Sequence, residues 1–577
     1  MTAAPGPMGA PAGVATIQPA GTARHSGRWA EAALLGVALV LGLGGFVLTA
    51  LNRTGSSPAQ TVMLGGAFLG LTVLMHLWVR YTAPWADPVL LPAAVALNGI
   101  GLAMIQRLDL AYEVNEQWQF YVGAKQLIWT LLGVILFCAV LFLLRDYRRL
   151  RRWDRWAMWS GLVFLVLPFI PGIGQSINGA RIWIRIGPMS FQPAELSKVL
   201  LAVFFASYLV ANRDNLALAG RKVLWMSLPR ARHLGPLFIV WGVSICVLVL
   251  QKDLGSSVLL FGLFVVVLYV ATDRPSWLLI GAALFLPAAW FAATHLHHVQ
   301  QRINGWLHAT DNAVYNAAGG SWQLLTGMFG MSTGGLMGAG WGKGSPTLVT
   351  FANSDFIFAS LGEELGLTGT LAILMLYLVL IQRGLRTAVS LRDGFGKLLA
   401  VGLSFAIALQ IFVVIGGVTR LIPLTGLTLP FLAYGGSSLL ANWVILALLL
   451  RLSDAARRPA THAPRIIDTA ELPVSLRRRV QDAGADEPAE ETVGSSPSQA
   501  ASPASAGYVD DQRAGQPEAG GYGPPSAAPG NPTNDATPTV FVSQEAPPPP
   551  HTAPDGETLR SSRAPGFSDD SDRRQQP

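Results

Sequence analysis

The sequence predicts an all-α polytopic membrane protein, and three observations support this fold class. Hydrophobic residues make up 51% of the 577 residues, charged residues make up only 13%, and the mean hydropathy is +0.42. The apolar residues gather in runs long enough to cross a bilayer, which takes about 20 residues. The basic residues lie in short segments between these runs, so the net charge of +7 does not indicate nucleic acid as a partner.

The apolar runs predict about 12 transmembrane helices. Polar residues at 251–255 separate the seventh run from the eighth, so we expect a tight turn there rather than one very long helix. The predicted spans cover residues 29–51, 60–79, 88–105, 124–144, 155–173, 194–211, 234–250, 255–272, 275–294, 355–382, 397–418 and 432–451.

The orientation follows from the basic segments. With 12 spans, four clusters of Arg and Lys fall on one side of the membrane, at 145–155, 213–232, 383–397 and 451–458. Because loops rich in Lys and Arg stay in the cytoplasm, we expect both termini to be cytoplasmic. The loops expected to face outward lie at 174–193, 295–354 and 419–431.

The two ends of the chain and its longest loop differ in composition. Residues 1–28 and 454–577 are rich in Pro, Ala, Gly and Ser, so they cannot bury a core and are expected to be disordered cytoplasmic tails. The outer loop at 295–354 instead contains apolar and aromatic residues such as Trp306 and Trp322. We expect this loop to pack on the membrane surface or to dip into it.

The cysteines and the clustered histidines do not predict a metal site. Cys138 and Cys246 lie inside apolar runs, where we interpret them as core residues rather than as a disulfide or metal ligands. His295, His297 and His298 have no second ligand cluster, so we interpret them as solvated loop residues.

A glycine-rich stretch at 334–344 leads into the tenth predicted span. Asn353, Ser354 and Asp355 come directly before that span, and all three residue types are good helix N-caps. Asp355 therefore has two readings, as a cap or as a catalytic carboxylate at the mouth of a membrane cavity. Position alone does not separate them.

Charged residues at membrane depth need partners. Glu363 and Glu364 lie inside the tenth span, where we expect structural pairing with a cation. Glu195 and Lys198 open the sixth span three residues apart, so they can form a local salt bridge on one helix face.

Several outward segments carry features that packing in lipid does not require. Residues 178–187 alternate like a short strand and place Arg181 and Arg185 outside, where arginines beside a cavity suit phosphate groups. Lys343 in the glycine-rich stretch fits the same idea. Residues 423–438 contain two prolines and three glycines, which predicts a re-entrant non-helical segment.

Five stretches, taken in order, resemble the SEDS family (shape, elongation, division and sporulation), whose members include RodA, FtsW and SpoVE. The similarity extends over about 88–453 and is closest to the RodA-type elongation branch, of the kind found in actinobacteria. The matching stretches are NGARIWIRIGPMSFQPAELSK at 178–198, QKDLGSS at 251–257, GGLMGAGWGKG at 334–344, NSDFIFASLGEELGLTG at 353–369 and PLTGLTLPFLAYGGSS at 423–438.

The chain departs from the family pattern at a few positions. The family often has Arg where this chain has Ile182, with Arg181 one place earlier, and often has Gly where this chain has Arg420. The family core has ten spans, so the resemblance implies that residues 29–87 form two extra N-terminal membrane helices.

The resemblance implies a peptidoglycan glycosyltransferase of the bacterial cytoplasmic membrane, with its active site facing outward. Such an enzyme polymerises lipid II, a disaccharide-peptide on undecaprenyl pyrophosphate, and inverts the anomeric carbon with a single base. Asp355 matches the catalytic carboxylate of the family. The residues expected to bind substrate are Arg181, Trp183, Glu195, Lys198, Lys343, Ser437 and Ser438. No residue is expected to bind a metal; a divalent cation at the pyrophosphate is left open.

The resemblance also implies a partner, a class B penicillin-binding protein that cross-links the new strand. Small residues allow close helix contact, so Gly262 and Gly281 are candidates for a lipid-facing groove that meets this partner. Two alternatives remain: a lipid II flippase, which should show inverted repeats, and a non-catalytic scaffold of the cell-wall machinery.

Overall fold

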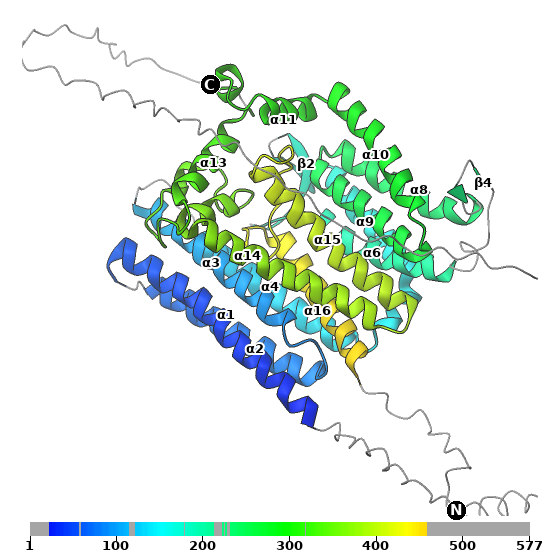
Figure 1. Cartoon of the computed structure of the whole chain (residues 1–577), viewed down its shortest axis with the longest axis horizontal. Helices are drawn as coiled ribbons and strands as arrows, with labels where there is room; N and C mark the ends of the chain where they lie inside the picture. Colours follow the sequence, from blue (N-terminus) through cyan, green and yellow to red (C-terminus); the bar gives the residue numbers. More distant parts are fainter. Residues whose placement is uncertain are drawn as a thin grey trace, which may run out of the picture. The chain divides into compact units, whose positions relative to one another are not determined.

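The computed structural model describes residues 22–56, 59–114, 122–177, 179–187, 189–212, 222–223, 226–227, 231–317 and 319–458. Its long helices lie side by side as a bundle (Figure 1). They are α1 (Thr22–Thr54), α2 (Ala59–Thr82), α3 (Leu90–Val114), α4 (Val122–Leu143), α5 (Asp154–Val166), α6 (Ala194–Ala211), α8 (Ala231–Leu250), α9 (Leu254–Thr272), α10 (Ser276–His295), α14 (Ile357–Ser390), α15 (Gly394–Val418) and α16 (Gly436–Arg457).

The short elements lie between these helices. Three 3₁₀ helices are η1 (Tyr147–Trp153), η2 (Leu167–Phe169) and η3 (Pro346–Leu348). Strands β1 (Gly174–Ile177), β2 (Ala180–Ile186) and β3 (Met189–Phe191) form an antiparallel sheet, and β4 (Lys222–Val223) pairs with β5 (Met226–Ser227). The segment at 295–354 contributes α11 (His297–Leu307), α12 (Asn312–Tyr315) and α13 (Trp322–Gly334).

The polytopic all-α fold class is confirmed. Ten of the described helices are long and apolar enough to cross a membrane, and the remaining two predicted spans form shorter helices. In the fifth, α5 ends at Val166 and η2 follows, because Pro168 lacks the N–H that a continuing helix would need. In the seventh, α8 covers Ala231–Leu250 and has Pro236 inside it.

The predicted ends of the membrane region differ slightly from those observed. Helix α1 already begins at Thr22, and α16 continues to Arg457 rather than ending before 454. Asp454 is buried, and its carboxylate accepts a hydrogen bond from the backbone N–H of Trp85 at 2.8 Å. The predicted tails at 1–21 and 459–577 lie outside the described residues.

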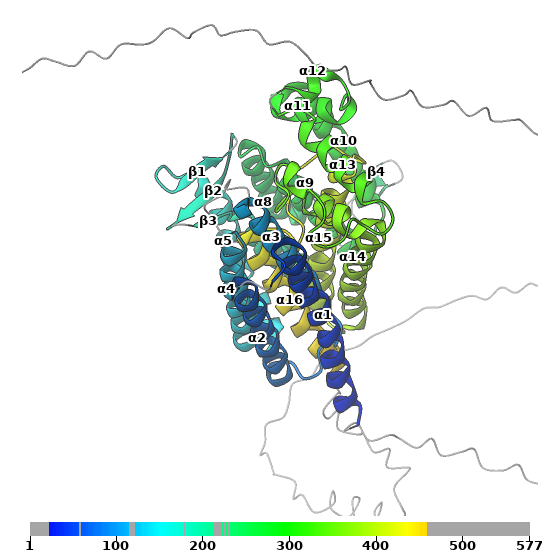
Figure 2. The ribbon, with the colours of Figure 1, turned by 90° about the vertical axis from the view of Figure 1, so that its left-hand side faces the viewer.

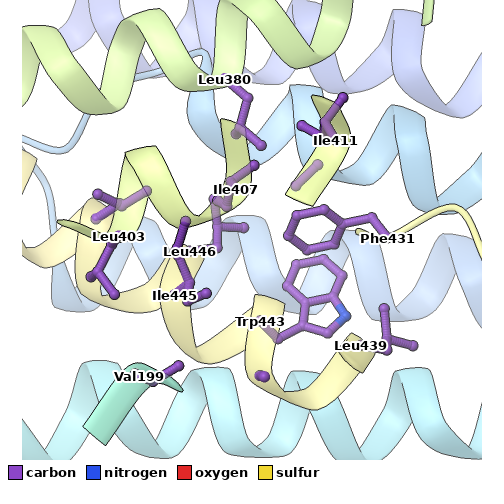
Figure 3. Packing of buried hydrophobic residues seen from close by; sticks show 14 of the residues in the cluster. Val199, Leu380, Leu403, Ile407, Ile411, Phe431, Leu439, Trp443, Ile445 and Leu446 are labelled. Carbon is purple, nitrogen blue, oxygen red and sulfur yellow. The ribbon is translucent and has the colours of Figure 1, made fainter. Parts of the chain in front are cut away.

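The centre of the bundle is packed by aromatic rings around α16 (Figure 3). The Trp443 ring meets Phe431 edge-on at 5.3 Å and Phe137 at 5.7 Å. Gly133 on α4 makes room for this ring, since a Cβ there would lie 2.4 Å from Trp443 Cδ1. The core therefore combines residues that are far apart in the sequence, from α4 and from the region of α16.

The first two helices pack against α3 and α4. A Cβ on Gly42 of α1 would lie 3.0 Å from the Cα of Gly99 on α3, so only small residues allow this approach. Trp78 of α2 donates its indole N–H to the carbonyl of Cys138 on α4 at 3.0 Å.

Two predictions about small side chains were wrong. Gly262 and Gly281 do not line a lipid-facing groove, because a Cβ at these positions would meet Leu409 at 2.4 Å and Val265 at 2.9 Å. Both glycines are used for packing within the chain. Cys246 is exposed on the bundle surface rather than in the core, and both cysteines are free.

Candidate functional site

Residues 423–435 of the predicted re-entrant segment run through the bundle without helical structure, as predicted, whereas residues 436–438 already form the start of α16. Four of the segment's carbonyl oxygens accept hydrogen bonds from polar side chains of four different helices. The pairs are Asn98 to Phe431 at 3.0 Å, Gln126 to Ala433 at 3.1 Å, Tyr377 to Pro430 at 2.6 Å and Gln410 to Thr428 at 2.8 Å. Irregular backbone at membrane depth needs such partners, so these side chains fix the path of the segment.

Asp355 lies beside this segment and does not cap a helix. The N-cap of α14 is Phe356, with no capping hydrogen bond from a side chain, so the capping reading was wrong. The neighbouring Asn353 carbonyl accepts the backbone N–H of Tyr434 at 2.8 Å, which ties the start of α14 to the re-entrant segment. The backbone beside Asp355 is thus held by the re-entrant segment, and the Asp355 side chain does not serve as the cap of α14.

The Asp355 carboxylate and the Arg302 guanidinium face the same glycine. A Cβ on Gly426 would lie 3.5 Å from Oδ2 of Asp355 and 3.5 Å from Nη2 of Arg302. Gly426 has φ +76°, a conformation that suits glycine. Nη1 of Arg302 donates to the carbonyl of Leu424 at 2.8 Å, which fixes the guanidinium against the re-entrant segment.

Arg302 comes from the outer loop and was not among the predicted site residues. It lies on α11, and α11 is held by Arg420, which donates to the carbonyls of Trp306 at 2.9 Å and Leu307 at 3.1 Å. Arg420 has φ +61°, so these bonds offset a strained backbone at a position where the family often has Gly. Arg181 was predicted as a site residue because it is an arginine on a loop expected to face outward. The same observation applies to Arg302.

The surroundings of Asp355 change its acidity. Burial raises the pKa of Asp355 to about 6, while the nearby positive charge of Arg302 acts to lower it. Burial lowers the pKa of Arg302, and the carboxylates of Asp355 and Asp253 both oppose that change. A carboxylate with a pKa near 6 is largely ionised at neutral pH and is a stronger base than an exposed one.

Asp253 is a second carboxylate close to Arg302. It caps α9 by accepting the N–H of Ser256 at 3.0 Å, and it also accepts a hydrogen bond from the side chain of Gln192 at 3.0 Å. Burial, followed by the charge of Glu195, raises the pKa of Asp253. Because its oxygens are already engaged, Asp253 supports the site rather than offering a free base.

Four of the predicted substrate-binding residues are buried beneath the re-entrant segment. Lys198 pairs with Glu195 at 2.6 Å and donates to Gln410 at 2.8 Å, and Gln410 in turn holds the segment. Ser437 accepts the backbone N–H of Gln192 at 2.9 Å, and Ser438 accepts from Asn442 at 3.2 Å. Glu195 and Lys198 thus support the segment through Gln410, whereas Ser437 and Ser438 lie in the first turn of α16.

The glycine-rich stretch at 334–344 wraps over a break in α14. Gly366 has φ +68° and interrupts the helix, which leaves the carbonyls of Glu363 and Glu364 to accept the N–H groups of Ala339 and Gly340 at 2.9 Å each. The Glu364 carboxylate forms a buried ion pair with Arg107, which confirms its predicted pairing with a cation.

The three remaining predicted residues lie on two other segments. Lys343 is exposed on the glycine-rich stretch, whose hydrogen bonds lead to Glu363 and Glu364. Arg181 and Trp183 are half-buried on β2. The β1–β3 sheet and α11–α13 lie at the same end of the bundle (Figure 2).

Comparison with known proteins gives consistent results. The family described as "Cell cycle protein", which takes in FtsW, RodA and SpoVE, matches residues 88–458. "Peptidoglycan glycosyltransferase RodA" of Mycobacterium tuberculosis is 46% identical over 453 residues, covering 78% of this chain and 95% of the relative. The protein of that name from Mycobacterium leprae is 45% identical over 451 residues, with the same coverage.

More distant relatives match a shorter part of the chain. "Probable peptidoglycan glycosyltransferase FtsW" of Geobacter metallireducens is 32% identical over 372 residues, covering 64% of this chain and 94% of the relative. The mycobacterial alignments are longer than residues 88–458, so that similarity extends beyond the family core. Among solved structures, Thermus thermophilus RodA is 24% identical with a TM-score of 0.39, covering 69% of this chain and 97% of that one.

Proposed function

The chain belongs to the FtsW/RodA/SpoVE family of cell cycle proteins and is a peptidoglycan glycosyltransferase of the RodA type, and we propose that Asp355 is the catalytic base of its reaction. The observation that carries this proposal is the carboxylate itself. It is half-buried, caps no helix, faces Gly426 together with Arg302, and has a pKa raised to about 6.

The proposed reaction needs one base and no covalent nucleophile. The hydroxyl of the acceptor sugar of lipid II attacks the anomeric carbon of the growing strand, and Asp355 takes the hydroxyl proton. A glycosidic C–O bond forms as the C–O bond to undecaprenyl pyrophosphate breaks, and inversion results. Pyrophosphate leaves without a proton when cations meet its charge, so no separate general acid is required.

Arg302 serves this base in two ways under the proposal. Its charge keeps Asp355 ionised despite burial, and its bond to the Leu424 carbonyl fixes where that charge lies. The described residues include no group of three or more His, Cys, Asp or Glu side chains placed to hold a metal.

The proposal is tested by Asp355→Asn, which keeps the shape of the side chain and removes its basicity. We expect lipid II polymerisation by the purified variant to fall at least about 100-fold, the usual contribution of a general base. The matched control is Asp311→Asn, an exposed aspartate on the same outer segment. Glycan chains made at the wild-type rate by a well-folded Asp355→Asn protein would refute the assignment.

We further propose that a class B penicillin-binding protein works beside this chain. The outward segments carry no Ser-x-x-Lys motif in a folded domain, so the strand leaving the site needs another enzyme for cross-linking. We expect coexpression with a partner whose catalytic serine has been replaced to raise the lipid II polymerisation rate several-fold. Equal rates with and without that partner would show that the chain works as a self-sufficient polymerase.

A further inference from the structure

A polar cavity rich in arginine lies where α2 and α4 end. It has a volume of about 370 Å³ and lies between the ends of α2, α4 and α16. Its lining comprises three arginines and four other residues, namely Arg145, Arg451, Arg458, Tyr81, Thr82, Leu141 and Phe142. None of these residues takes part in the site described above.

The charge around this cavity is strongly positive. Asp454 is the acid next to it, with its carboxylate 2.7 Å from Arg458 and 3.8 Å from Arg451. Arg145 instead places its guanidinium carbon 5.7 Å from the centre of the Phe142 ring. The three arginines are close enough to repel one another, so the cavity favours an anion.

Arg451 is built into the wall of the cavity. Its side chain is only 3% exposed, and it donates to the carbonyl of Thr82 at 2.8 Å and to the carbonyl of Leu141. These carbonyls lie in the last turns of α2 and α4, where a cation is favourable. The Nε of Arg451 is buried without an acceptor among the described residues.

Aromatic and apolar side chains flank the cavity on the membrane side. The Trp78 ring lies 6.4 Å from Tyr81 and 6.2 Å from Phe142. Tyr81 is 76% exposed and Leu143 is 68% exposed, although both are large and apolar. Tyr and Trp at helix ends mark the level of the lipid headgroups, so the cavity opens where phosphate groups of the bilayer lie.

We propose that this cavity binds the phosphate headgroup of an anionic phospholipid, with the acyl chains lying along the exposed faces of α2 and α4. The arginines match the phosphate, and the flanking aromatic rings match the start of the acyl chains. A free phosphate would use only the first of these features. Because α2 belongs to the N-terminal extension while α4 and α16 belong to the core, the bound lipid would join the two.

The test uses the purified full chain and measures lipid retention by native mass spectrometry. The variant Arg145→Gln/Arg458→Gln removes the two exposed arginines and leaves the buried Arg451 in place. The control Arg149→Gln/Arg152→Gln removes the same charge from exposed arginines of η1 that do not line the cavity. Each protein is titrated with phosphatidylglycerol, with phosphatidylcholine and with inorganic phosphate.

We expect wild type and control to retain phosphatidylglycerol in preference to phosphatidylcholine. The cavity variant should retain about tenfold less phosphatidylglycerol than wild type. Equal retention by cavity variant and control would overturn the proposal, as would equal retention of the two lipids by wild type. Displacement of phosphatidylglycerol by millimolar inorganic phosphate would overturn the assignment to a lipid and identify a small-anion site.

Discussion

Two effects act in opposite directions on the carboxyl group of Asp355. Burial favours the neutral acid, whereas the guanidinium of Arg302 favours the carboxylate, and the balance is a pKa of about 6. Burial alone would raise the pKa of Asp355 further, and the neutral acid cannot act as a base. With full exposure the group would be ionised but only weakly basic. Under the proposal, Arg302 therefore favours the ionised form that a base requires.

Sequence reasoning identified Asp355 but not Arg302, for a physical reason. Asp355 lies in a motif that can be read locally, directly before an apolar helix. Arg302 reaches the site only because α11 folds back over the re-entrant segment, a contact between residues 302 and 424 that no local pattern encodes. Its one signal was a positive charge on an outward loop, where the positive-inside rule does not call for one.

At the scale of elements, the re-entrant segment is held by its hydrogen bonds and shaped by Gly426. Substituting Gly426→Ala should cost about 1–2 kcal/mol of folding free energy, because an L-residue is strained at positive φ. The new Cβ would also lie 3.5 Å from both Asp355 and Arg302. We therefore expect a large loss of polymerisation rate in addition to this small loss of folding free energy.

The matched control for this prediction is Gly172→Ala. Gly172 also has a positive φ, +85°, but a Cβ there would meet nothing within 4 Å. Both variants should lower the unfolding temperature in detergent by similar amounts, and only Gly426→Ala should lose activity. If the two variants lose activity equally, the space beside Asp355 does not matter for the reaction.

The elements that the sequence predicted well are those with a local cause. Long apolar runs became long helices, and the alternating stretch before α6 became β2. The errors concern what lies between elements: α5 is shortened at Pro168, and Gly262 is covered by Leu409 of another helix. The reading of Asp355 as a helix cap was wrong for a similar reason, because tertiary contacts rather than a capping side chain hold the start of α14.

At the scale of the whole molecule, the outer end and the basic end have different compositions. The β1–β3 sheet and helices α11 and α12 lie at one end of the bundle (Figure 2), whereas the exposed arginines of η1 directly follow α4 in the chain. We expect a cysteine at Asn316 to react with an impermeant maleimide from outside intact cells, and one at Arg149 to react only after permeabilisation.

This labelling needs a background without Cys138 and Cys246, and both target positions are exposed in the structure. The single-cysteine proteins should accumulate to the same level, so that labelling reports sidedness only. Reaction of both positions from the same side would mean that the number of membrane crossings between them is even, and the proposed orientation would fail.

The central claim, that Asp355 acts as an ionised base tuned by Arg302, is tested most directly by the pH dependence of lipid II polymerisation. Activity should rise with pH through about 6 and then level off, because the carboxylate form increases in that range. Arg302→Gln removes the charge that lowers the pKa of Asp355, so its acidic limb should move to higher pH. Lys343→Gln removes an exposed charge and should leave the limb where it is. An acidic limb at the same pH in wild type and Arg302→Gln would contradict the account.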